Sequence, residues 1–202
     1  MISATQALTE LKEGNQRFTA GISEGNTPHI HDIPKVQERQ APFAIILGCS
    51  DSRVPAEIVF DQGMGDLFVI RIAGNIVAPS QLGSIEFAVE QFGTPLVVVL
   101  GHSSCGAVIA TLEDIKKPSP ENSPNVFSIV KRIRPTVEAL LGKETHTDDQ
   151  DLLEKAIQAN ILASVEQLKN ESPLLKAFIE KKQLLIVGAE YSLNTGKVTF
   201  ID

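Results

Sequence analysis

Four apolar segments rich in β-branched residues most constrain what this 202-residue chain can fold into. Residues 44–48, 67–72, 96–101 and 184–189 are hydrophobic almost throughout, rather than at every second position. Strands of that kind are buried on both faces, as in a parallel sheet covered by helices, whereas a strand with one solvated face alternates. The segments therefore predict an α/β fold with four parallel strands.

The segments between these strands carry the periodicity of helices, and a last short segment is typical of an edge strand. Amphipathic spacing predicts helices over residues 3–20, 34–40, 56–61, 80–92, 106–115, 126–141, 149–170 and 174–181. A turn at 194–196 precedes residues 197–201, which we expect to form an antiparallel fifth strand.

We interpret residues 1–202 as one domain, although prolines at 118, 120 and 124 interrupt the chain. The strand at 184–189 must rejoin the sheet, so this break does not separate two domains. Four regions follow in order: an N-terminal helical arm (1–40), a βα core (41–115), a helical region (116–182) and C-terminal strands (183–202).

Composition excludes several classes of partner. A net charge of -7 without a cluster of basic residues argues against nucleic acid. No apolar run approaches the roughly 18 residues that cross a bilayer, and the first residues lack the pattern of a signal peptide. We therefore expect a cytoplasmic protein that binds no membrane.

The two cysteines of the chain both lie at the ends of predicted strands. Cys49 directly follows residues 44–48, and His102 and Cys105 directly follow residues 96–101. Ligands of open α/β sheets gather at the carboxyl ends of the strands, so these side chains can converge. Two thiolates and one imidazole favour zinc over harder cations. We expect one Zn²⁺ per chain.

The fourth zinc position is open to water, a carboxylate or another histidine, and Asp51 is the natural carboxylate. Arg53 can withdraw Asp51 from the metal through a bidentate, charge-assisted pair. The vacated position then accepts water, which the metal acidifies towards hydroxide. Because two thiolates donate more electron density than imidazoles do, we expect activity to rise on the alkaline side.

Other interpretations of the same residues stay open at this point. The thiols can form a disulfide, and Cys49 with Asp51 alone is also typical of a buried thiol near a capping carboxylate. A non-catalytic, zinc-stabilised interaction module is a second possibility, but a closed structural site would not require Asp51 and Arg53. A thiol redox protein is disfavoured because no Cys-x-x-Cys is present.

The two motifs together resemble those of the β-class carbonic anhydrases. The resemblance rests on Cys49-Ser-Asp51-Ser-Arg53 followed by His102-x-x-Cys105-Gly106, and it extends through residues 60–63, 68–75 and 83–87. It covers residues 3–110 closely and the rest in the order and character of the elements.

The resemblance implies a reaction and a role for each motif residue. Members of the family hydrate CO₂ reversibly to bicarbonate and a proton through a zinc-bound hydroxide. Zinc is then held by Cys49, His102 and Cys105, with hydroxide or a resting-state Asp51 in the fourth position. Asp51, paired with Arg53, accepts a hydrogen bond from the hydroxide and so orients it.

The same resemblance implies substrate contacts and an assembly. The Gln40 side chain reaches the substrate from a partner chain, and the Gly106 N–H is a further donor to a bound anion. Phe68, Ala73 and Phe87 match positions that line the apolar CO₂ pocket. The family implies a homodimer or homotetramer with the site at the dimer interface and with the first helix wrapped around the partner. A hydrolase for CS₂ or COS on the same scaffold is the alternative.

One subgroup of the family binds bicarbonate at an inhibitory site made of Trp, Arg and Tyr. Arg71 matches that arginine, but Ile46 stands at the tryptophan position and Phe87 at the tyrosine position. We therefore predict that this chain lacks the inhibitory site.

Overall fold

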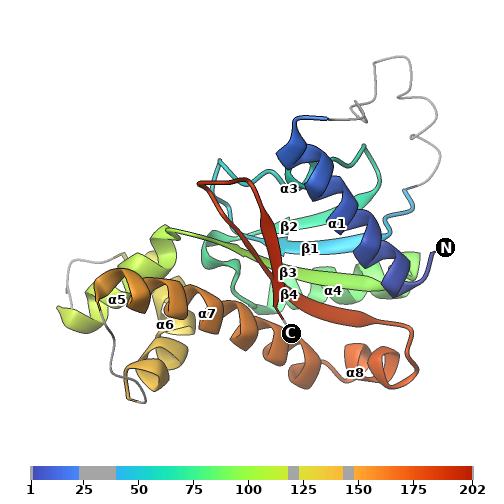
Figure 1. Ribbon diagram of the computed structural model, residues 1–202. Helices are drawn as coiled ribbons and strands as arrows, with labels where there is room; N and C mark the ends of the chain where they lie inside the picture. The colour runs from blue at the N-terminus through green and yellow to red at the C-terminus, as the bar shows by residue number, and fades with distance from the viewer. Residues whose placement is uncertain (1, 23–39, 118–122, 143–147, 202) are drawn as a thin grey trace.

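A five-stranded sheet forms the centre of the computed structural model, which describes residues 2–22, 40–117, 123–142 and 148–201 (Figure 1). The strands are β1 (Ala44–Gly48), β2 (Leu67–Arg71), β3 (Leu96–His102), β4 (Leu185–Tyr191) and β5 (Val198–Ile201). Their order across the sheet is β2-β1-β3-β4-β5. The pairs β1–β2, β1–β3 and β3–β4 are parallel, whereas β5 runs antiparallel to β4. The predicted fold class is confirmed.

Helices connect and cover the strands, at bounds close to those predicted. They are α1 (Ala4–Ala20), α3 (Ala56–Val59), the 3-10 helix η2 (Ala73–Asn75), α4 (Pro79–Phe92), α5 (Gly106–Lys116), α6 (Pro124–Leu141), α7 (Asp149–Glu171) and α8 (Pro173–Glu180). The helix predicted over 56–61 ends at Val59, because the chain turns at Asp61 with φ 47°. The helix predicted over 34–40 lies outside the described residues except for Gln40, which is in no helix.

Both faces of the sheet are covered, which explains the continuous hydrophobicity of its central strands. Ile45 and Leu47 of β1 pack in one core cluster with residues of α4 to α8. Ala44 and Ile46 pack in a second cluster with residues of α1 and α3. Figure 1 shows α1 on one side of the sheet and α6 and α7 on the other. Alternate side chains of one strand therefore enter different cores, and every position must be apolar.

Helix α1 packs against its own chain. The resemblance implies that this helix wraps a partner, but its residues Ala7 and Leu11 are fully buried within the second cluster. The side chain of Asn15 donates to the backbone oxygens of Val59 and Gly196, and accepts from the N–H of Val198. The predicted apolar stripe packs against the chain's own sheet, and the wrapping of a partner by this helix stays a prediction.

Strand β4 lies beside β3 after the long helical excursion from α5 to α8. This pairing supports the interpretation of one domain over residues 1–202, which stays a prediction. Within the described residues, none of the helices is both long and apolar enough to cross a membrane.

Candidate metal centre

Cys49, His102 and Cys105 meet at the carboxyl end of the sheet, where we predicted them. Their ligand atoms all lie within 4.8 Å of one another, and all three residues are buried. Cys49 directly follows β1, His102 ends β3, and Cys105 caps the start of α5. The chain leaves β1 for β2 on one side, and later crosses to β3 on the other. The three residues thus lie at the switch point of the sheet, where ligands of such folds bind.

The orientation of His102 is set by a backbone oxygen. Its Nδ1 lies 2.9 Å from the carbonyl oxygen of Ser103, so Nδ1 carries the proton and donates it. The Nε2 atom is then a lone-pair acceptor, and it is buried without a hydrogen-bond partner among the described residues. Ser103 is itself fixed, because its N–H donates to the Tyr191 oxygen and its hydroxyl accepts from the N–H of Leu193.

The two sulfur atoms are unbridged and chemically unequal. A hydrogen bond from the Cys105 thiol lowers the pKa of Cys49, and the Gly74 N–H acts in the same direction. The Gly74 N–H lies 3.4 Å from the Cys49 sulfur. The neighbouring Cys49 thiolate, together with burial, raises the pKa of Cys105. Such a pair shares one proton, which a divalent cation would displace, leaving two thiolates.

Asp51 is held beside the three residues rather than among them. Arg53 donates from Nε to one carboxylate oxygen at 2.9 Å and from Nη2 to the other at 2.8 Å, and its backbone N–H adds a third bond at 3.0 Å. This pairing keeps the pKa of Asp51 well below its usual range. One oxygen of Asp51 still lies 3.8 Å from His102 Nε2. The carboxylate is therefore ionised, oriented and adjacent to the cluster.

Two of the predicted pocket residues contact each other, and a third follows the strand that carries one of them. Phe68 of β2 and Phe87 of α4 contact each other with ring centroids 6.5 Å apart, and Phe87 is 51% exposed. Ala73 lies in η2, directly after β2. At Gly106, the first residue of α5, an added Cβ would meet nothing within 4 Å. The start of α5 therefore borders open space, as an anion site requires.

Gln40 does not approach this cluster within one chain. It precedes β1, whereas Cys49 follows β1. The nearby Pro42 oxygen accepts a hydrogen bond from Thr94, just before β3 begins. Gln40 therefore lies at the amino end of the sheet, away from Cys49.

Sequence reasoning missed the groups that support the ligands. Arg71, which we considered only as a remnant of an inhibitory site, donates to the backbone oxygens of Cys49 and Asp51. The Gly74 N–H and the Ser103 oxygen support a sulfur and an imidazole. Backbone groups carry no residue-specific signal, although the glycine at 74 hinted that the backbone there is unusual.

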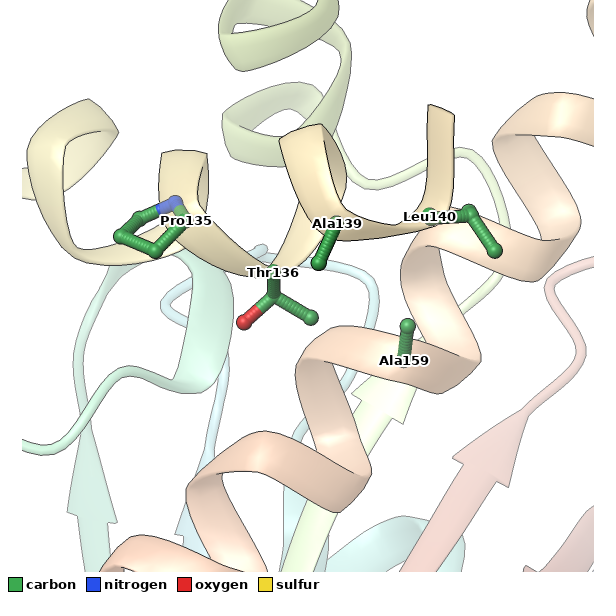
Figure 2. A pocket seen from close by; sticks show the side chains of 5 residues that line it. All are labelled: Pro135, Thr136, Ala139, Leu140 and Ala159. Atoms are coloured by element: carbon green, nitrogen blue, oxygen red, sulfur yellow. The ribbon is translucent and has the colours of Figure 1, made fainter. Parts of the chain in front are cut away.

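A separate groove between α6 and α7 has a volume of about 450 Å³ (Figure 2). Its lining consists of Pro135, Thr136, Ala139, Leu140 and Ala159. None of these side chains titrates, so this groove lacks the ionisable groups of the cysteine–histidine cluster.

The donor set fits zinc. Two sulfurs and one imidazole nitrogen suit a tetrahedral zinc site with one position left over, which is typical of catalytic rather than structural zinc. Among the described residues the buried Nε2 of His102 has no hydrogen-bond partner, and burying it without a metal would cost free energy, because buried polar groups are normally hydrogen-bonded or bound to a metal.

Comparisons with known proteins agree with this assignment. Residues 44–198 match the carbonic anhydrase family. The chain is 41% identical over 192 residues to carbonic anhydrase 2 of Mycobacterium tuberculosis, covering 95% of this chain and 90% of the relative.

Solved structures show the same fold. The β-carbonic anhydrase CcaA superposes with a TM-score of 0.79 at 29% identity, covering 98% of this chain and 88% of that chain. A tetrameric β-carbonic anhydrase from Sordaria macrospora superposes with a TM-score of 0.74 at 26% identity, covering 98% and 95%. The chain therefore belongs to the β-class carbonic anhydrase family.

Proposed function

We propose that Cys49, His102 and Cys105 hold the zinc ion of a carbonic anhydrase, and that Asp51 and Arg53 complete its catalytic site. The chain hydrates CO₂ reversibly to bicarbonate and a proton with zinc as its cofactor. The observation that carries the residue assignment is the buried Nε2 of His102, which has no hydrogen-bond partner among the described residues. His102 belongs to a cluster whose ligand atoms all lie within 4.8 Å of one another.

Zinc bound there would supply a Lewis acid that makes water nucleophilic at neutral pH. The chain's own residues do the rest. Asp51 accepts a hydrogen bond from a donor next to the cluster, and Arg53 keeps the carboxylate of Asp51 oriented. The Gly106 N–H, at the start of α5, donates to the anionic product. Phe68, Ala73 and Phe87 exclude water from the side on which CO₂ arrives.

We further propose that two chains share each site. Phe87 is large, apolar and half exposed, and a partner surface would cover it. The position of Gln40 at the amino end of the sheet is compatible with a contact to a partner's substrate, because β1 separates it from Cys49 in its own chain. The solved relative from Sordaria macrospora is tetrameric. We propose a homodimer or homotetramer, with Gln40 acting across the interface.

Two smaller assignments belong to the same proposal. We propose a cytoplasmic location, which the two unbridged cysteines support, because thiols persist in reducing compartments. Cell fractionation tests the location.

We also propose that bicarbonate does not inhibit the enzyme allosterically, since the Arg71 side chain already donates to backbone oxygens and Ile46 is apolar. A hyperbolic dependence of the rate on bicarbonate is expected, and a sigmoidal one would contradict the proposal.

Stopped-flow CO₂ hydration between about pH 6.5 and 9, with the metal content measured on the same sample, tests the function directly. We expect zinc-dependent hydration that increases with pH. Release of H₂S from CS₂ or COS, measured in parallel, should be much slower. Fast H₂S release with slow CO₂ hydration would favour the hydrolase on this scaffold, and a zinc-loaded chain inert to all three substrates would favour a non-catalytic module.

A further inference from the structure

We propose that Asn160 and Ser164 of α7 are positioning residues of the metal centre, acting through the turn that carries Gly74. They hold η2 in the conformation that directs the Gly74 N–H at the Cys49 sulfur. This inference rests on the proposed function, because it concerns how the same cluster is oriented for its metal.

Both side chains bind the turn directly. The Asn160 amide donates to the Gly74 oxygen at 2.9 Å, and the Ser164 hydroxyl donates to the Asn75 oxygen at 3.1 Å. Asn160 and Ser164 are each 4% exposed. They are four residues apart on one helix, so they lie on the same face and reach consecutive carbonyls of the turn. Burying polar side chains this deeply costs free energy unless they are hydrogen-bonded, and both of these side chains meet that requirement at the turn.

The turn requires such support because its backbone is unusual. Gly74 has φ 70° and Asn75 has φ 44°, and a non-glycine residue at positive φ is uncommon and costs conformational energy. An added Cβ at Gly74 would lie 2.8 Å from Ile133 and 3.0 Å from Ala107. Glycine therefore permits both the conformation and the close packing, and α7 holds the turn in place.

Two glycines of the sheet bring α7 close enough to do this. A Cβ at Gly101 of β3 would lie 2.5 Å from Ile161, and one at Gly188 of β4 would lie 2.8 Å from the same side chain. The two glycines thus leave room for Ile161 to pack directly against the backbone of neighbouring strands. This close packing places Asn160, the preceding residue, within hydrogen-bond distance of the turn.

Support of the turn affects the Cys49 sulfur through the Gly74 N–H. A hydrogen bond from Gly74 to the Cys49 thiolate orients the sulfur before a metal binds and withdraws some of its electron density. Loss of the support should therefore weaken metal binding, and it should also make the sulfur a stronger electron donor. A purely structural role for α7 would produce neither change specifically.

The test compares two variants with a matched control on the same helix. Asn160→Leu replaces the amide by an apolar group with the same branching and number of heavy atoms, and Ser164→Ala removes one hydroxyl. Leu168→Ala destabilises the same buried face of α7 without a polar contact to the turn. Zinc affinity is measured by chelator competition, and the thiolate-to-cobalt charge-transfer band is measured after Co²⁺ replaces zinc.

We expect Asn160→Leu to bind zinc roughly 10-fold more weakly, as supporting groups of metal ligands typically do. Its cobalt band should move to longer wavelength, with a smaller shift for Ser164→Ala. Ser164→Thr, which keeps a hydroxyl, should retain the wild-type band. Leu168→Ala should lower the melting temperature but leave the band in place.

A wild-type band in both Asn160→Leu and Ser164→Ala, with zinc affinities no lower than that of Leu168→Ala, would overturn the inference. If Asn160→Leu does not fold, the comparison of Ser164→Ala with Ser164→Thr decides alone. A wild-type chain that binds neither zinc nor cobalt at the cysteines would instead overturn the proposed function, so the two failures are distinguishable.

Discussion

Residues two positions apart illustrate how much of the site follows from sequence. Asp51 and Arg53 flank a turn, and the arginine binds the carboxylate through both its side chain and its backbone N–H. The convergence of Cys49, His102 and Cys105 was equally predictable, because the ends of neighbouring parallel strands meet at one edge of the sheet. The Gly74 N–H and the Ser103 oxygen were not, because every residue carries such groups and only the folded backbone aims them.

We expect Arg53→Ala to retain zinc but to lose at least about 100-fold in the rate of CO₂ hydration, because Asp51 loses the partner that orients its carboxylate. Arg53→Lys keeps the positive charge without the bidentate geometry, so its rate of CO₂ hydration should lie between those of the wild type and Arg53→Ala. Stopped-flow rates and zinc content check this. Lys116→Ala, at an exposed ion pair with Asp149, is the control and should keep the wild-type rate. Full activity of Arg53→Ala would refute the role of the pair.

At the scale of the elements, the sequence predicted the strands well because burial on both faces leaves an unbroken apolar signature. The order of the strands and the separate cores above and below the sheet required the structure. The apolar stripe of α1 was also predicted, but a stripe does not reveal which surface it contacts. Asn15 was overlooked altogether, since a polar residue on a helix is normally solvated and only the fold buries it.

Asn15→Leu should lower the free energy of unfolding by about 2–4 kcal/mol, because the Val59 and Gly196 oxygens and the Val198 N–H would lose their partner. Urea unfolding followed by circular dichroism measures the change. The adjacent, exposed Gln16→Ala should stay within about 0.5 kcal/mol of the wild type. Equal stabilities of Asn15→Leu and Gln16→Ala would show that the docking of α1 does not depend on this network.

For the whole molecule, sequence composition bounded the class of protein, but it said nothing of how chains assemble. The single chain leaves Phe87 half exposed and Gln40 remote from the cluster, and an assembly would account for both. A mixture of defective chains tests whether sites are shared.

Gln40→Ala and Cys49→Ser chains should each be poorly active alone. Coexpressed with different tags and purified as mixed dimers, they should regain activity, because one of the two sites then combines an intact cluster with an intact Gln40. The purified mixed dimers should show about half of the wild-type rate per chain, and an unselected mixture of random pairs should show about a quarter. No recovery in verified mixed dimers would place Gln40 outside the partner's site.

The central claim is that one zinc ion on Cys49, His102 and Cys105 supports turnover, and titration of metal-free protein tests it most directly. The folded chain is stripped with a chelator and zinc is added back while CO₂ hydration is followed. We predict negligible activity without metal, linear recovery, and saturation at one zinc per chain, with no recovery in Cys49→Ser. Full turnover of the metal-free chain, or normal recovery in Cys49→Ser, would contradict the account.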